Sequence, residues 1–218
     1  MTHTITEENY IKSIYLLQLT VDKVSTSLLS AEINTKPASV TDMLKKLRAK
    51  RIVHYQRYKG FSLTEAGNKK ALSIIRKHRL WEYFLVNKLG FEWDEVHMVA
   101  EELEHITSNE LIIRLDNFLG NPSFDPHGDP IPDQHGKIKS LKQANLSTIP
   151  LKKTASVSSV RNQSAEMLEM LNHFQIGIGT KLKIIRRFEF DGSVEIKIDR
   201  HPVTIISKQV AQNVYCIL

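Results

Sequence analysis

The residues from Ser27 to Thr64 leave few folds open to this chain. SLLSAEI has the apolar spacing of a short helix, NTKPASV brings a turn at Pro37, and SVTDMLKKLRAKRIV resumes the helical period. The segment RIVHYQRYKGFSLT then alternates apolar and polar residues around Lys59-Gly60, as expected for a two-stranded hairpin. Two short helices joined by a tight turn and followed by a hairpin predict a winged helix-turn-helix.

Basic residues gather in the same part of the chain. Between Lys36 and Arg79 there are thirteen lysines and arginines against two carboxylates, although the net charge of the whole chain is only +6. Such a surplus indicates a surface for a polyanion, and the second short helix is where a recognition helix presents side chains to DNA. The residues expected to face DNA, there and on the hairpin, are Lys36, Ala38, Ser39, Thr41, Asp42, Lys46, Arg57 and Lys59. A winged helix that contacts only proteins through a solvated basic face is the alternative interpretation.

The rest of the chain predicts a mainly α-helical protein with a small β domain. The helical period continues in a long helix that ends at Gly90, and further helices are expected over about 94–104 and 108–119. From about Arg161 the composition turns to short β-type segments, which suits a small barrel of SH3-like size. We therefore expect a winged-helix domain over 1–65, a helical domain over 66–135, a linker over 136–160 and an SH3-like domain over 161–218.

Two further features indicate the compartment. No apolar run approaches the roughly 20 residues that cross a bilayer, and the N-terminus MTHTITEENY lacks the pattern of a secretory signal. A cytoplasmic location is therefore the default expectation. Cys216 is the only cysteine, which excludes an internal disulfide and a cysteine-based zinc cluster.

The segment VHMVAEELEH at 96–105 combines imidazoles and carboxylates in a stretch, 91–113, without lysine or arginine. On a continuous helix one face would carry His97, Glu101, Glu104 and His105. The preceding long helix offers His78 and Glu82 at the same four-residue spacing. Neutral imidazole and carboxylate oxygen suit Mn, Fe, Co, Ni or Zn. A solvated acidic helix with structural histidines would have the same spacing, so the residues alone leave both interpretations open.

The longer motifs resemble those of a known family. RKHRLWEYFL, VHMVAEELEH and DPHGDPIP have the order and spacing of the diphtheria toxin repressor family of metal-dependent regulators, and SVTDMLKKL and YKGFSLTEAG resemble its DNA-binding part. The resemblance covers nearly the whole chain and is strongest over 1–135. It implies a winged-helix domain, a helical dimerisation domain with two metal sites, and a C-terminal SH3-like (FeoA-like) domain.

The resemblance also implies roles for individual residues. The family's principal metal site is matched by Glu101, Glu104 and His105. Its ancillary site is matched by His78, Glu82 and His97, with Gln163 and Glu166 as further donors from the C-terminal domain. Metal binding in such proteins would align two recognition helices of a homodimer with a palindromic operator.

Two departures from the family pattern bear on the metal. Glu101 stands where the iron-responsive branch has a cysteine, and a harder oxygen ligand favours Mn²⁺, with Fe²⁺ as the second choice. Asn9 stands where the family has Asp or Met, and it is expected to donate a neutral carbonyl oxygen. Lys12 stands where some manganese-responsive members carry Glu. Glu7 or Glu8 could replace Asn9 if the start of the helix shifts.

These features together predict a non-enzymatic, metal-dependent repressor of metal-uptake genes that binds double-stranded DNA. Two alternatives stay open. One is a winged-helix regulator without metal control, which Asn9 favours. The other is a metal-dependent hydrolase, although the chain has E-x-x-E-H rather than the H-E-x-x-H pattern of helical zinc enzymes.

Overall fold

The computed structural model describes residues 3–56, 60–198 and 201–218 of the 218-residue chain. The chain divides into two compact units. The first comprises residues 1–78, 101–112 and 132–138, and the second comprises residues 79–100, 113–131 and 139–218. Among the described residues, every helix is too short or too polar to span a membrane.

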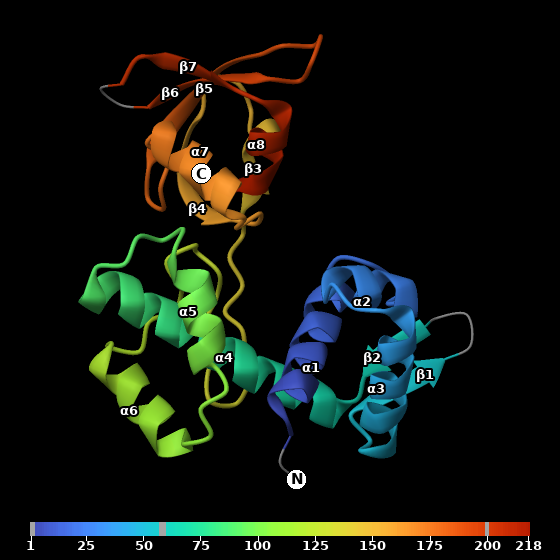
Figure 1. Ribbon diagram of the computed structural model, residues 1–218. Helices are drawn as coiled ribbons and strands as arrows, with labels where there is room; N and C mark the ends of the chain where they lie inside the picture. Colours follow the sequence, from blue (N-terminus) through green and yellow to red (C-terminus); the bar gives the residue numbers. More distant parts are fainter. Residues whose placement is uncertain (1–2, 57–59, 199–200) are drawn as a thin grey trace. The chain divides into compact units, whose positions relative to one another are not determined.

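The first unit contains the predicted winged helix-turn-helix (Figure 1). Its elements are α1 (Ile5–Gln18), α2 (Thr26–Glu32), α3 (Pro37–Ala49), β1 (Val53–Gln56), β2 (Gly60–Leu63) and the first part of α4 (Glu65–Leu89). Pro37 occupies the first turn of α3, where its missing N–H leaves no helical bond unmade. The antiparallel pairing of β1 with β2 confirms the hairpin. A buried apolar core that includes Ile11, Ile14, Leu44 and Leu47 holds the helices together.

The start of α1 is fixed by a capping box. The Thr4 hydroxyl accepts a hydrogen bond from the backbone N–H of Glu7, and the Glu7 carboxylate accepts one from the backbone N–H of Thr4. With Tyr10, Ile11 and Ile14 packed in the core, Glu7 and Glu8 are buried while Asn9 is exposed.

The acidic segment forms a shorter helix than the sequence predicts. Helix α5 covers Val96–Leu103, and Glu104 and His105 lie in the turn that follows it. The backbone N–H of Ile106 donates to the carbonyl of Leu103 and closes this turn. The single stripe of four ligand-type residues predicted for a continuous helix is therefore wrong, because the helix ends before its last two members. Helix α6 (Asn109–Phe118) follows close to its predicted bounds.

The C-terminal part folds as a six-stranded antiparallel sheet in the order β3-β8-β4-β5-β6-β7. Its elements are β3 (Ala144–Asn145), η1 (Leu146–Thr148), β4 (Thr154–Val160), α7 (Ala165–His173), β5 (Lys181–Arg187), β6 (Val194–Ile198), β7 (Val203–Ile206), α8 (Lys208–Asn213) and β8 (Val214–Ile217). Within the described ranges β3 and β7 do not pair with each other, so the small SH3-like domain is an open sheet rather than a closed barrel.

Two strands of this sheet lie where the sequence predicts a linker, over 136–160. Strand β4, with the sequence TASVSSV, buries Ala155, Val157 and Val160 in the core of the sheet. Two of its three serines, Ser158 and Ser159, are also buried, and both hydroxyls donate to the side-chain oxygen of Gln143. Because two buried positions of this strand hold serines whose hydroxyls are hydrogen-bonded, its hydrophobic pattern is weak. The composition therefore suggests a linker there.

Candidate metal centre and nucleic-acid interface

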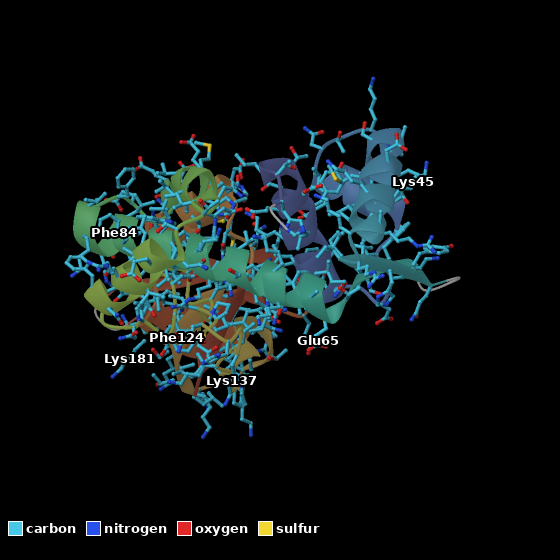
Figure 2. The ribbon with its side chains drawn as sticks, turned by 90° about the horizontal axis from the view of Figure 1, so that it is seen from below. Lys45, Glu65, Phe84, Phe124, Lys137 and Lys181 are labelled. Atoms are coloured by element: carbon cyan, nitrogen blue, oxygen red, sulfur yellow. The ribbon has the colours of Figure 1, made fainter. Side chains whose placement is uncertain are left out.

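The predicted recognition helix, α3, presents its DNA-facing candidates to solvent. The exposed residues are Lys36, Ala38, Ser39, Thr41, Asp42 and Lys46, whereas Arg57 and Lys59 lie outside the described residues. Lys45, labelled in Figure 2, is also exposed and pairs with Asp42 at 3.1 Å between Nζ and Oδ1. The opposite face of α3 is anchored by apolar residues of the core. The helix therefore offers a polar, cation-rich face without loss of packing.

Some of the basic charge of α3 is used within the protein. The Nζ atoms of Lys46 and Lys50 lie 3.1 and 2.7 Å from Oε1 of the buried Glu7. Burial would raise the pKa of Glu7, but the hydrogen bonds from Lys50, Thr4 and Lys46 outweigh it and lower the pKa to about 2. Glu7 is therefore an ion-pair partner that fixes α3 against α1.

A first cluster of charged residues joins α1 to the turn after α5, within the first unit. Its members are Glu8, Lys12, His78, Glu101, Glu104 and His105. At its centre Glu104 is fully buried, and Lys12 Nζ lies 2.7 and 2.9 Å from its two carboxylate oxygens. His78 Nδ1 lies 2.6 Å from Glu104 Oε2. Burial would raise the pKa of Glu104, but the His78 hydrogen bond and the Lys12 charge outweigh it and lower the pKa.

Glu8 is the residue of α1 that reaches the histidine of this cluster. Its Oε2 lies 2.7 Å from His105 Nδ1, and its Oε1 lies 2.6 Å from Lys70 Nζ. Asn9, which the family pattern places at the metal, is exposed. Glu101 is half exposed and lies 3.3 Å from Lys12 Nζ. The structure thus brings Glu8, Glu104 and His105 together, with Lys12 among them.

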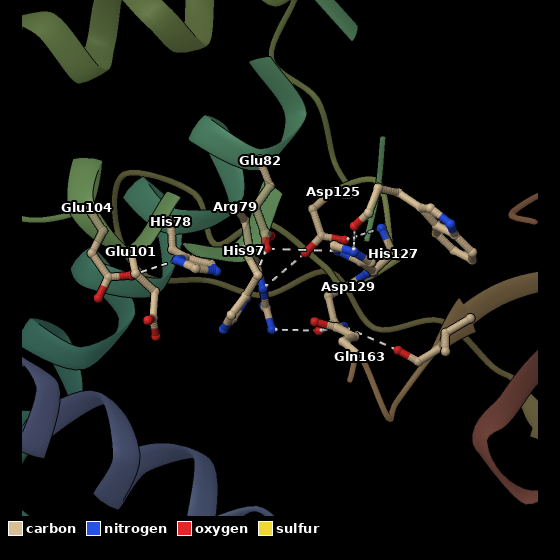
Figure 3. Close-up of polar contacts among 12 residues, drawn as sticks. His78, Arg79, Glu82, His97, Glu101, Glu104, Asp125, His127, Asp129 and Gln163 are labelled. Carbon is tan, nitrogen blue, oxygen red and sulfur yellow. Dashed lines mark hydrogen bonds and ion pairs between the residues drawn. The ribbon is translucent and has the colours of Figure 1, made fainter. Parts of the chain in front are cut away.

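A second cluster, made of Glu82, His97, Asp125 and His127, lies within the second unit (Figure 3). Glu82 Oε1 lies 3.4 Å from Nδ1 of the exposed His97 and 3.9 Å from Nδ1 of the buried His127. His78 is one turn before Glu82 on α4, as its spacing predicts. Among the described residues, ligand atoms within 4.8 Å of one another are offered by Glu82, Asp125 and His127 of this unit, but not by Glu101, Glu104 and His105 of the first.

Asp125 is an unusual carboxylate because it is buried beside two others. Burial and repulsion from Glu82 and Asp129 raise its pKa well above the ordinary range, although the Arg79 guanidinium opposes this. Its Oδ1 accepts hydrogen bonds from the backbone N–H groups of His127 and Asp129, both at 2.9 Å. Such an excess of buried negative charge favours a bound cation.

The orientation of His127 completes a donor set for a metal. Its Nε2–H donates to the backbone carbonyl of Trp93 at 2.8 Å, and the Trp93 ring stacks on the imidazole. The second nitrogen, Nδ1, is buried and has no hydrogen-bond partner among the described residues. A histidine that donates one N–H to a carbonyl keeps the other nitrogen free to bind a metal. The residues present therefore fit a divalent cation.

The loop DPHGD, residues 125–129, is tightly packed and fixes the positions of Asp125 and His127. Gly128 has φ +83°, and a Cβ there would lie 1.9 Å from the carbonyl oxygen of Ser158, so only glycine fits. The backbone N–H of Val160 donates to the carbonyl of His127. Strand β4 thus holds the loop on which Asp125 and His127 stand.

The sequence interpretation did not assign Asp125 and His127 as ligands. The Asp-Pro-His-Gly motif could have indicated them. Its two ligand-type side chains are too close in sequence to follow the helical spacing by which the other candidates were found. Of the two predicted C-terminal donors, Gln163 reaches this region, because its Nε2 donates to Asp129 Oδ2 at 3.1 Å. Glu166 is exposed at the start of α7.

The same chain contains a winged helix with an exposed basic recognition helix and two clusters of carboxylates and imidazoles. This combination defines a class of protein, the metal-responsive DNA-binding regulators. Comparison with family models agrees with this class. Residues 3–61 match the iron-dependent repressor N-terminal DNA-binding domain, residues 64–133 match the iron-dependent repressor metal-binding and dimerisation domain, and residues 144–218 match the FeoA domain.

Individual proteins resemble the chain over long stretches. A solved structure of a manganese-dependent transcriptional repressor in complex with manganese is 33% identical, with 97% of this chain and 99% of that chain covered and a TM-score of 0.87. The iron-dependent repressor IdeR of Mycobacterium tuberculosis is 31% identical over 127 residues, which are 58% of this chain and 55% of that protein. A probable metal transport system membrane protein of Chlamydia trachomatis is 44% identical over 77 residues, 35% of this chain and 17% of that protein. The chain thus spans about half of IdeR and a smaller part of the chlamydial protein.

These matches assign the family. The chain belongs to the iron-dependent (diphtheria toxin) repressor family of metal-dependent transcriptional repressors. The predicted family, the winged helix-turn-helix and the C-terminal FeoA-like domain are confirmed.

Proposed function

We propose that this chain represses metal-uptake genes by binding a palindromic operator as a homodimer when Mn²⁺ is available, with Fe²⁺ as the second choice of metal. The observation that carries the proposal is the buried group of Glu82, Asp125 and His127, which gathers carboxylates around an imidazole nitrogen that has no hydrogen-bond partner among the described residues. The manganese complex of a relative 33% identical supports the same choice of metal. The proposed activity is binding rather than catalysis, and because its target is DNA we propose that it takes place in the cytoplasm.

We propose two metal sites in each subunit. The second cluster would hold one ion through Glu82, Asp125 and His127, with His97 beside Glu82 and Gln163 beyond Asp129. His78, which the family pattern adds to this site, lies one turn before Glu82 on α4. The first cluster would hold the other through Glu101, Glu104 and His105, with Glu8 or Asn9 from α1. Carboxylate and imidazole donors without thiolate suit Mn²⁺ and Fe²⁺. Glu166 would contribute only if α7 moved its exposed carboxylate toward Asp129.

A bound divalent ion supplies positive charge that offsets the repulsion among these carboxylates. Residues of the protein orient the groups that would bind the ion. His127 stays oriented by its bond to the Trp93 carbonyl, and Arg79 holds Asp125 and Asp129 from the other side, at 3.4 and 3.1 Å. In the first unit, Glu8 and His105 connect the helix that begins the DNA-binding domain to the turn after α5. We propose that these links limit the movement of α1 and so favour the DNA-binding arrangement.

The proposed contacts with DNA come from the exposed face of α3, with Lys36, Ala38, Ser39, Thr41 and Asp42 near base edges and phosphates and Lys46 near the backbone. Arg57 and Lys59 would add phosphate contacts from the hairpin. We further propose the domain division of residues 1–65 for DNA, 66–135 for metal and dimerisation, and a C-terminal FeoA-like domain. The matches of 3–61, 64–133 and 144–218 to the corresponding family models support this division.

The test is selection of bound fragments from genomic DNA with and without Mn²⁺ at one fixed salt concentration. Fixed salt is needed because a basic surface retains DNA nonspecifically at low ionic strength. We expect one palindrome to be enriched only with Mn²⁺. The variant Glu82→Gln should lose most of this dependence, whereas Glu102→Gln, an exposed residue of α5, should keep it. Equal enrichment without any metal would instead support a winged-helix regulator without metal control, and no enrichment in any metal would refute the proposal.

A further inference from the structure

The ammonium group of Lys12 stands where a cation of the first cluster would bind. Lys12 lies on α1, its side chain is 11% exposed, and Nζ is 2.7 Å from Oε1 of Glu104, whose side chain is 0% exposed. The same nitrogen is 2.9 Å from Oε2 of Glu104 and 3.3 Å from Oε1 of Glu101. One lysine therefore contacts both carboxylates proposed as ligands of the first metal site.

The remaining lone pairs of Glu104 are also engaged. His78 Nδ1 lies 2.6 Å from Oε2, and His105 Nε2 lies 3.5 Å from Oε1. A divalent ion binds a carboxylate oxygen directly, at roughly 2.0–2.2 Å, so it needs the same lone pairs that now accept from Lys12. An ammonium and a dication on one buried carboxylate would also repel each other strongly, because the surroundings screen charge poorly.

The positions of the possible metal ligands agree with Lys12 occupying the cation position of the first cluster. Glu101, Glu104 and His105 are not among the described groups whose ligand atoms converge within 4.8 Å, whereas Glu82, Asp125 and His127 of the second cluster form such a group. Glu8, the carboxylate of α1 at His105, is itself paired with Lys70 at 2.6 Å. The first cluster is thus held in an ion-paired arrangement by lysines, whereas the cation beside Asp125 in the second cluster is the Arg79 guanidinium, 3.4 Å away.

We propose that Lys12 is the built-in cation of the first cluster: its ammonium links α1 to the Glu104 turn without metal, and a divalent ion can bind Glu101 and Glu104 only by displacing it. This rests on the proposed function, since it assigns to one residue the control of metal affinity at the first site. The consequence is a weak first site beside a stronger second site. The position of α1 then depends partly on the ion pair between Lys12 and Glu104 and not only on bound metal.

The test measures Mn²⁺ binding at the first site alone, by electron paramagnetic resonance of free Mn²⁺ in equilibrium with the full chain. The second site is first disabled by combining Glu82→Gln with Asp125→Asn. In that background Lys12→Met removes the charge and keeps an apolar stem of similar length. We expect Mn²⁺ to bind at least tenfold more tightly to the Lys12→Met protein, and the metal-free melting temperature to fall because the buried Glu104 loses its partner.

Matched variants separate this role from a merely structural ion pair. Lys12→Arg keeps the charge and should leave the affinity weak, and Lys23→Met removes an exposed lysine elsewhere and should change nothing. Lys12→Gln serves as a second neutral variant if Lys12→Met does not fold. Mn²⁺ affinity that is unchanged, weaker or still undetectable in both neutral variants would overturn the proposal.

The proposed function can fail separately from this inference. If operator binding by the unmodified chain requires Mn²⁺ while removal of the Lys12 charge leaves first-site affinity unchanged, the repressor function stands and the role of Lys12 is refuted. If no metal promotes operator binding in any variant, the proposed function fails whatever the affinity measured for Mn²⁺.

Discussion

Replacement of Asp125 by Asn is predicted to have opposite effects on the protein with and without metal. In the metal-free protein, burial and the charges of Glu82 and Asp129 raise the pKa of Asp125 well above its ordinary range. An acid whose pKa is higher in the folded than in the unfolded state makes the fold less stable at pH values above the folded pKa, and this loss is relieved as the pH falls through it. Removal of the charge should therefore stabilise the metal-free protein at neutral pH.

The contacts that the variant keeps support this direction. It loses the 3.4 Å contact between Asp125 and Arg79, but an Asn oxygen can still accept from the backbone N–H groups of His127 and Asp129. We therefore expect the metal-free variant to melt at a higher temperature than the metal-free unmodified protein. With Mn²⁺ at 100 times its dissociation constant, the second site stabilises the unmodified protein by about 2.7 kcal/mol, which the variant loses.

The assay is differential scanning calorimetry of the full chain in chelator and in Mn²⁺. For a chain of this size about 2.7 kcal/mol corresponds to a difference of about 5–10 °C between the metal-induced shifts of the two proteins. Glu102→Gln, which removes an exposed carboxylate of α5, is the control and should show the full shift. An Asp125→Asn protein with an undiminished Mn²⁺-induced shift would refute the assignment of Asp125 as a ligand.

Three further perturbations test the first unit. Glu7, whose pKa is lowered to about 2, contributes stability that is complete above about pH 4.5 and is lost as the pH falls toward 2; acid titration of the melting temperature should therefore show a shallower loss in Glu7→Gln. Leu47→Ala, at a fully buried position of α3, should lower the free energy of unfolding by about 2–5 kcal/mol in urea denaturation. Lys36→Ala should weaken operator binding and reduce the slope of log affinity against log salt by about 1 if Lys36 contacts a phosphate, and an unchanged slope would exclude that contact.

Much of the fold could be predicted because it depends on local patterns. The helical period predicted α3, although Pro37, expected in the turn, lies in its first turn. The alternation around Lys59-Gly60 predicted the hairpin that pairs Val53 with Leu63. The β-type segments after Arg161 were sufficient for the C-terminal sheet, but β4 was missed because its buried positions include serines that are satisfied by Gln143. Hydrophobic spacing carries no information about a polar group whose partner lies elsewhere in the chain.

The sequence by itself determined the winged helix, the basic recognition face and the residue types able to hold a metal. Only the tertiary structure decided which of these side chains meet. The packing of α1 through Ile11 and Ile14 leaves Glu8 buried and Asn9 exposed, and α5 ends at Leu103, before Glu104 and His105. Long-range packing brings Lys12 to Glu104 and Asp125 with His127 to Glu82. Such encounters depend on helix phase, helix ends and buried charge, which are set by the whole fold rather than by neighbours in sequence.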